Sequence, residues 1–198
     1  MRMVTRFAAA MLALVVGAPA FASPWTGADP ARRPTTSGRP DLDFAVTEIC
    51  FPYIVTRVPL EEVVGRPGVS RKAGGVWRDG LKQFTLGTPQ VFVTLSEISS
   101  AGRSCTIDVA EMDADTFRDT TATLLARLSL TLKPARQQLP PDRSYLSREV
   151  LCSAPSEINV MVGINVANKP WQDLSTLNLV WAQRDLFNPC NEPLEAKR

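Results

Sequence analysis

The feature that most constrains the fold is a run of strict alternation over residues 158–167. Aliphatic side chains occupy every second position of this run: Ile158, Val160, Val162, Ile164 and Val166. A period of two predicts a β-strand whose aliphatic face meets a core while its other face stays free. Such one-sided strands are typical of antiparallel sheets, because parallel sheets are covered on both faces.

Shorter segments show the same period and predict further strands. Residues 145–152 and 177–181 flank the alternating run and complete one meander with it. Residues 82–86, 91–95 and 105–109 predict a second meander earlier in the chain.

Helical patterns precede each meander. Asp41 is the predicted N-cap of the first helix, and Pro52 is expected to end or kink that helix near Cys50. Its apolar residues are spaced by three and four: Leu42, Ala45, Val46, Ile49 and Tyr53. Asp113 or Asp115 is the predicted cap of a later helix. One face of that helix carries four apolar residues and a threonine: Phe117, Thr121, Leu124, Leu125 and Leu128.

A short helix and a loop are predicted between the first helix and the first meander. Pro59 is expected to open a helix that runs to Gly65. Residues 65–75 contain four glycines, one proline and three positive charges, which favour a mobile surface loop. No Gly-Lys-Ser/Thr closes this segment as in a Walker A motif, so a weak anion site is only the alternative interpretation.

These patterns together predict an α+β fold in which helices pack on one face of an antiparallel sheet. The order helix, strands, helix, strands also allows two α-plus-meander units, which would begin at about Asp41 and about Asp113. A chain of 198 residues suits one domain of ordinary size, so residues 41–190 are expected to form a single domain.

The N-terminus predicts export. Arg2 and Arg6 precede an apolar, uncharged stretch over residues 7–17, which is too short to span a bilayer. A small-x-small triplet then ends at Ala22, and it predicts signal-peptide cleavage between Ala22 and Ser23. The expected location is therefore the periplasm or the cell exterior, with no membrane span in the mature chain. An uncut N-terminal anchor is the alternative.

Composition separates the two ends of the mature chain from its centre. Residues 23–40 contain four prolines and no hydrophobic period, which predicts a disordered leader, and residues 191–198 predict a polar tail. Loss of residues 1–22 removes two of the 22 basic side chains and none of the 20 acidic ones. The mature chain is then neutral, so we expect no general attraction to nucleic acid or to an anionic membrane.

Four cysteines in an exported chain predict two disulfides. Three connectivities are possible, and topology favours Cys50–Cys105 with Cys152–Cys190. Cys152 ends one predicted strand and Cys190 follows the third strand of the same meander. The first and third strands of a meander run in the same direction, so these two ends share one edge of the sheet.

The residue types exclude most catalytic machinery. The chain has no histidine, which removes Ser-His-Asp and Cys-His sites and nearly all zinc enzymes, and no metal or cofactor motif is found. Paired carboxylates remain. Glu61 and Glu62 would diverge by about 100° on a helix, while helix capping explains the group Asp113, Asp115 and Asp119.

Two tryptophans suggest a binding face. Trp171 is predicted in the loop between the last two strands, and Trp77 stands beside Arg78 at the end of the glycine-rich segment. Tryptophan is enriched at interaction hot spots, so Trp77, Arg78 and Trp171 are the predicted binding residues. The alternative is that Trp171 folds back over the edge of the sheet, and Trp181 on a strand is expected in the core.

Short motifs over residues 41–128 resemble an uncharacterised group of small exported bacterial proteins that contain disulfides. The resemblance rests on Glu48-Ile49-Cys50-x-Pro52 and on Cys105-Thr106-Ile107. It implies export and disulfide formation, and it implies no activity.

The predicted function is a non-catalytic binding or accessory module for another envelope molecule, a protein or a glycan. The first alternative is a His-free hydrolase that uses carboxylates on a glycan. The second is a structural envelope protein with no discrete site. No cofactor is expected in any of the three.

Overall fold

The computed structural model describes residues 38–78, 81–86, 90–97, 102–128, 130–135, 138–153, 159–182 and 190. The predicted signal peptide, its cleavage site, most of the leader and the polar tail lie outside the described residues. Helix α1 (Arg39–Phe44) already contains Arg39 and Pro40, so the folded part begins before Asp41.

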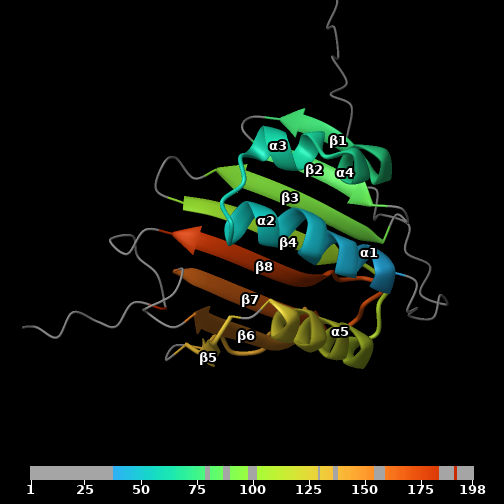
Figure 1. Cartoon of the computed structure of the whole chain (residues 1–198). Coiled ribbons are helices and arrows are strands. Elements are labelled where there is room, and N and C mark those ends of the chain that lie inside the picture. The colour runs from blue at the N-terminus through green and yellow to red at the C-terminus, as the bar shows by residue number, and fades with distance from the viewer. Residues whose placement is uncertain are drawn as a thin grey trace, which may run out of the picture.

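An eight-stranded sheet forms the centre of the protein (Figure 1). Every neighbouring pair is antiparallel, and the order across the sheet is β1-β2-β3-β4-β8-β7-β6-β5. The strands are β1 (Ala73–Arg78), β2 (Leu81–Leu86), β3 (Val91–Glu97), β4 (Gly102–Val109), β5 (Leu132–Pro134), β6 (Tyr145–Ser153), β7 (Val160–Ala167) and β8 (Ser175–Ala182). The predicted antiparallel sheet and α+β class are confirmed.

The sheet is built from two consecutive units. Helices and the meander β1–β4 form the first, while helix α5 (Ala114–Arg127) and the meander β5–β8 form the second. The last strands of the two meanders, β4 and β8, pair along eight residues from Gly102↔Ala182 to Val109↔Ser175. The order of elements therefore matches the predicted pair of α-plus-meander units, joined at the middle of the sheet.

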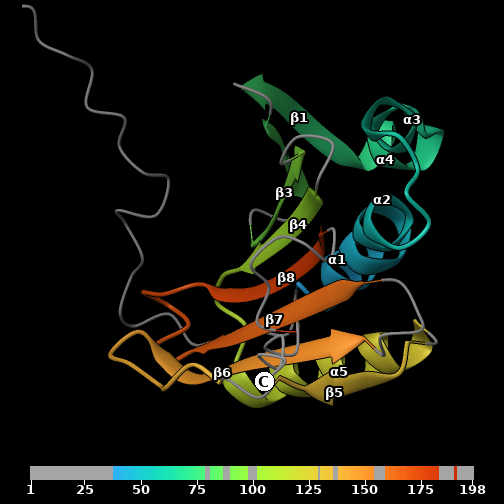
Figure 2. The ribbon, with the colours of Figure 1, turned by 90° about the vertical axis from the view of Figure 1, so that its left-hand side faces the viewer.

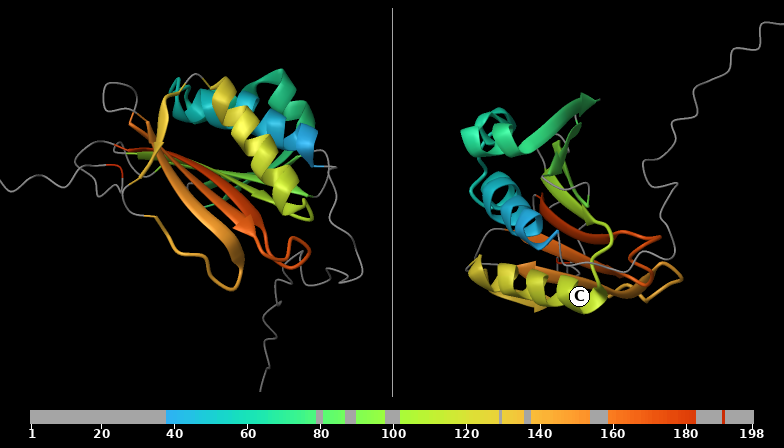
Figure 3. Two further views of the ribbon diagram at one scale, coloured as in Figure 1. Left: turned by 90° about the horizontal axis from the view of Figure 1, so that it is seen from below. Right: turned by 90° about the vertical axis from the view of Figure 1, so that its right-hand side faces the viewer.

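All helices lie on one face of the sheet, and we call the other the open face (Figures 2 and 3). Helix α5 contacts β7 and β8, while α2 (Phe51–Ile54) contacts β4 and β8. Within the described part of the chain, no helix combines the length and apolarity that crossing a membrane requires.

The first helix corrects two predictions. Its N-cap is Gly38, without a side-chain hydrogen bond, and Asp41 lies buried in the first turn. Of the two effects predicted for Pro52, an end or a kink, the end of the helix is wrong, because residues 45–50 widen into a π-helical segment, η1 (Ala45–Cys50), that continues into α2. There the Phe51 N–H bonds to the carbonyl of Val46, five residues back. Widening by one residue leaves one carbonyl without a donor, and proline, which has no N–H, fits that position.

The predicted glycine-rich loop is also wrong. Helix α3 (Leu60–Gly65) forms as expected, but a further helix, α4 (Pro67–Lys72), follows it and leads directly into β1. Pro67 has a backbone φ suited to the first turn of a helix, which outweighs the cost of Gly68 within it. Helix α4 contacts both α3 and β1, so tertiary packing supports it.

The core lies between the helices and the inner face of β3, β4, β7 and β8. Burial alternates along these strands as the sequence period predicts. Helix α5 contributes the side chains of Phe117, Thr120, Thr121, Leu124 and Leu125. Asp113 caps this helix by accepting a hydrogen bond from the Thr116 N–H at 2.8 Å, which confirms one of the two predicted caps.

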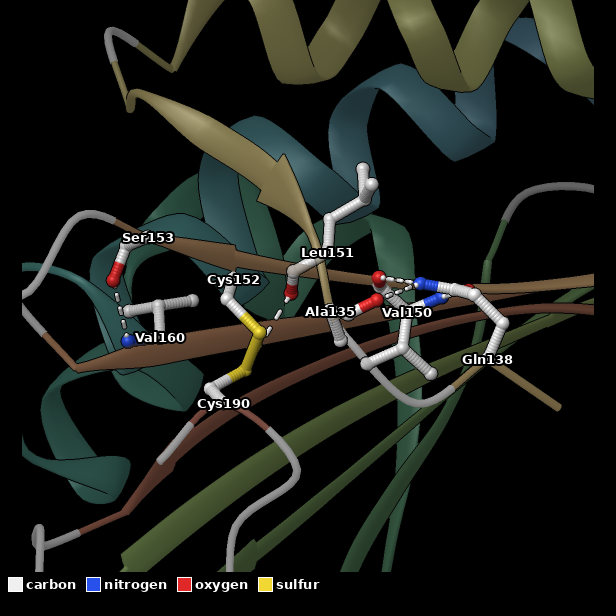
Figure 4. The surroundings of a disulfide bond; sticks show 8 residues. All are labelled: Ala135, Gln138, Val150, Leu151, Cys152, Ser153, Val160 and Cys190. Atoms are coloured by element: carbon white, nitrogen blue, oxygen red, sulfur yellow. Dashed lines mark hydrogen bonds between the residues drawn. A yellow bond between two sulfur atoms is a disulfide. The ribbon is translucent and has the colours of Figure 1, made fainter. Parts of the chain in front are cut away.

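Both predicted disulfides are present. Cys50–Cys105 joins η1 to β4 inside the core, where both residues are fully buried. Cys152–Cys190 joins β6 to the end of the described chain, and it is partly exposed (Figure 4). Leu151 pairs with Val162 on the core side, so the neighbouring Cys152 lies on the open face.

A glutamine covers the outer edge of β6 where β5 ends. The Gln138 side chain accepts a hydrogen bond from the Val150 N–H at 2.8 Å and donates to the Val150 carbonyl at 2.9 Å (Figure 4). It also donates to the Ala135 carbonyl at 2.8 Å. The Gln138 amide thus forms the two hydrogen bonds with Val150 that the backbone of a further strand residue would form.

Candidate functional site

Trp171 lies in the β7–β8 loop, residues 168–174, which is firmly attached to its surroundings. The carbonyl of Lys169 accepts hydrogen bonds from the N–H groups of Gln172 and Asp173, both at 2.8 Å. The Asn168 N–H donates to the Ser144 carbonyl at 2.8 Å, which ties the loop to the turn before β6. These bonds close the loop into a compact turn and hold the Trp171 backbone in place.

A cavity of about 150 Å³ opens at this loop. Two segments line it: Ala110 and Glu111 from the β4–α5 connection, and residues 170–174 from the loop. Trp171 is partly buried there, while its neighbour Pro170 is buried. The alternative that Trp171 folds back over the edge of the sheet and the prediction that it lines a binding face are therefore compatible. Its side chain is neither fully exposed nor fully buried.

Glu111 is the unusual residue of the site. Its φ is 58°, in the left-handed region that non-glycine residues rarely occupy, and the residue is only 8% exposed. Its N–H donates to the Pro170 carbonyl at 2.8 Å, while the neighbouring Ala110 N–H donates to the Gln90 carbonyl at 2.8 Å. A left-handed conformation costs an L-residue roughly 1–2 kcal/mol, so surrounding contacts must hold it. Backbone strain of this kind concentrates at functional sites.

The charges of the cavity lining are one-sided. Glu111 and Asp173 contribute two carboxylates, and no basic side chain is found among the lining residues that the structure describes. Lys169 belongs to the same loop but is exposed and does not line the cavity. The remaining lining is apolar or amide: Ala110, Pro170, Trp171, Gln172 and Leu174. An aromatic ring, an apolar wall and two acids are therefore gathered around a small volume.

The other two predicted binding residues lie elsewhere. Trp77 and Arg78 belong to β1, the edge strand at the far side of the sheet from β5. Strands β2, β3 and β4 separate β1 from β8, which corresponds to about 19 Å at the usual spacing of strands. The structure does not bring Trp77 and Arg78 together with Trp171, so the three cannot share one small-ligand site.

A row of side chains crosses the open face near the same end of the sheet. Strand register places Phe92, Asp108, Thr176, Asn165 and Arg148 side by side on five neighbouring strands. Thr176 Oγ1 donates to the Asp108 carboxylate at 3.0 Å. Burial raises the pKa of Asp108, and the Thr176 hydrogen bond opposes that rise.

At the opposite end of the sheet, two arginines stack on aromatic rings. The Arg57 guanidinium lies 4.4 Å from the centre of the Trp181 ring, and that of Arg103 lies 5.1 Å from the Tyr53 ring. Arg103 also donates to the Val58 carbonyl at 3.0 Å. Burial is the main cause that raises the pKa of Tyr53 above its usual range. This cluster fastens the α2–α3 connection to the sheet, and Trp181 is only partly buried rather than central to the core.

Among the described residues, no three cysteine or acidic side chains gather as ligands for a metal ion. The sequence pointed to Trp171 but not to Glu111, because the left-handed backbone and the approach of residue 111 to the loop depend on tertiary structure.

No protein-family model, curated protein or solved structure matches the chain.

Proposed function

We propose that the protein is an exported binding module that contacts another envelope molecule, a protein or a glycan, through the cavity at Trp171. The observation that carries the proposal is the partly buried Trp171 ring beside a cavity of about 150 Å³ with a strained, buried glutamate in its lining. A loop held by backbone hydrogen bonds presents this ring, so little ordering is needed on binding.

Export is supported by the N-terminal pattern and by the two disulfides. The basic pair, the apolar stretch and the small residues before Ser23 have the layout of a cleaved signal peptide. Disulfides persist in the periplasm and outside the cell but are rare in the cytosol. The proposal assigns no reaction to the protein.

Quantitative affinity capture tests this function. The oxidised protein is immobilised and exposed to the envelope fraction of its native cell, alongside a Trp171→Ala variant. We expect one envelope molecule to bind in stoichiometric amount and to be lost with the variant, because the indole supplies much of the contact area.

The matched control is Leu146→Ala, which truncates a side chain that is 45% exposed on β6. This variant should capture the same molecule as the unmodified protein. If no molecule is captured, or if Trp171→Ala captures it equally well, the proposed function is wrong. Unchanged circular dichroism spectra of both variants would show that the comparison is one of binding and not of folding.

A further inference from the structure

We infer that the cavity at Trp171 takes an alkylammonium group. The inference deepens the proposed function by naming the chemistry of the ligand, and it rests on that function. It follows from the volume, the charge and the rigidity of the cavity lining.

The volume suits a small group. A cavity of about 150 Å³ holds a molecule the size of benzene. The end of a lysine side chain or a trimethylammonium head has a similar number of heavy atoms. A sugar ring with its hydroxyl groups is larger and would have to remain mostly outside.

The charge selects a cation. Among the described lining residues, the only charged side chains are the carboxylates of Glu111 and Asp173. Trp171 also lines the cavity, and the face of an indole ring attracts ammonium groups. Ala110, Pro170 and Leu174 supply apolar contact for the carbon atoms next to the nitrogen. An anion would be repelled, and a neutral group would gain only the apolar contact.

Backbone hydrogen bonds fix the two segments that line the cavity. The hydrogen bond from the Glu111 N–H to the Pro170 carbonyl links the buried acid directly to the loop that carries Trp171. Lys169 closes the same loop through two hydrogen bonds to its carbonyl. These hydrogen bonds hold Glu111 in its left-handed conformation, which lowers the conformational cost of binding.

Nuclear magnetic resonance titration of the oxidised protein tests the inference. The readout is the indole N–H resonance of Trp171, assigned by its loss in a Trp171→Phe variant. The probes are n-butylammonium, which resembles a lysine side chain, and choline, which carries a quaternary head. Their neutral counterparts are n-butanol and 3,3-dimethylbutan-1-ol, and the ionic strength is held constant with sodium chloride.

We expect a saturable shift of the Trp171 resonance with at least one cation, at a Kd on the order of 1–10 mM for so small a group. The neutral counterpart should bind about tenfold more weakly or worse. Asp173→Asn should weaken binding of the cation about threefold or more, because it removes one carboxylate charge. Stronger binding of n-butylammonium would point to a lysine of a partner protein, and stronger binding of choline to a small-molecule or lipid headgroup.

The matched control is Glu62→Gln, which removes a carboxylate whose side chain is 63% exposed on α3, outside the cavity lining. This variant should bind the cation as the unmodified protein does. The inference is overturned if neither cation shifts the Trp171 resonance up to about 100 mM, a concentration far above the expected Kd. It is also overturned if the neutral compounds bind equally well, or if Asp173→Asn changes nothing.

The two proposals fail in different ways. Loss of cation binding together with intact Trp171-dependent capture would remove the alkylammonium chemistry and leave the binding module. Cation binding without any captured envelope molecule would leave a small-molecule site and remove the proposed partner.

Discussion

The two units of the sheet share an order of elements but are stabilised in different places. In the first, a disulfide joins a helix to a central strand inside the core, and no described strand covers the outer edge of β1. In the second, the disulfide lies on the open face, and the edge is formed by a three-residue strand followed by the Gln138 cap. The first meander is thus stabilised by a crosslink in the core, and the second by a crosslink and a side-chain cap at the surface.

The difference shows that a crosslink has two separable effects. The entropy of the unfolded chain depends on the separation of the two cysteines in sequence, which is 55 residues for the first bridge and 38 for the second. These lengths give similar contributions, about 4 kcal/mol each in the loop-closure model. Burial of the sulfur atoms is what distinguishes the bridges, because only the first fills space in the core.

The largest expected effect is loss of the buried bridge. The double variant Cys50→Ala/Cys105→Ala should lower the free energy of unfolding by about 4 kcal/mol or more, because lost packing adds to lost crosslinking. Cys152→Ala/Cys190→Ala should cost about 1 kcal/mol less than that. Guanidinium unfolding of both variants measures the two values. An equal or reversed order would show that burial of the first bridge contributes nothing.

The next effect concerns the covered edge. Gln138→Ala should lower the free energy of unfolding by about 2 kcal/mol, because it leaves the partly enclosed Val150 N–H without its acceptor. Hydrogen exchange at the Val150 amide should accelerate at the same time. Gln172→Ala, which truncates an exposed glutamine, is the control and should change neither quantity. Unchanged exchange at Val150 in the first variant would contradict the capping role.

A smaller effect tests how α5 is attached to the second unit. Asp113→Ala should cost about 1 kcal/mol at neutral pH, as the loss of an N-cap does. Hydrogen bonds from Thr116 hold the pKa of Asp113 below its usual range. The stabilisation is therefore present above the pKa of the unfolded chain and is lost as pH falls through the folded pKa.

Urea unfolding between neutral pH and about pH 2 measures this loss. The control is Asp115→Ala, whose side chain is 89% exposed and pairs with Arg118 only at the surface. It should cost less than about 0.5 kcal/mol. A penalty for Asp113→Ala that persists undiminished at low pH would rule out the charged cap.

The smallest expected effect is an increase in the free energy of unfolding, whereas the other variants lower it. Burial raises the pKa of Asp108 on the open face, so the folded state holds its proton to higher pH than the unfolded state does. Stability from this group is present below the unfolded pKa and is lost as pH rises through the folded pKa. Asp108→Asn keeps an acceptor for Thr176 and should raise the free energy of unfolding by about 0.5 kcal/mol at neutral pH. Near pH 3 the gain should vanish, and a gain independent of pH would contradict the assignment to charge.

The parts of the fold that sequence could predict are those governed by local period. Alternation along β7 and β8 located both strands, and the spacing in α5 located its buried face. The disulfide pairing followed from strand direction within a meander. Each of these inferences needs only residues that are neighbours in sequence or in one supersecondary unit.

The wrong predictions involve contacts between units or exceptions to local rules. The π-helical segment before Pro52 accommodates a residue that normally ends a helix, and packing against α3 and β1 keeps α4 helical despite Gly68. The approach of Glu111 to Pro170 joins segments about sixty residues apart. No local pattern signals such an approach, so the contribution of Ala110 and Glu111 to the cavity lining could not be predicted.

The pairing of consecutive cysteines also bears on how the proposed export would proceed. When a chain crosses a membrane N-terminus first, Cys50 and Cys105 reach the oxidising side before Cys152 and Cys190 do. Each cysteine then meets its native partner before the next competing thiol arrives. A thiol oxidase acting during translocation would produce the native connectivity by order of arrival, without the slow exchange that corrects mispaired disulfides.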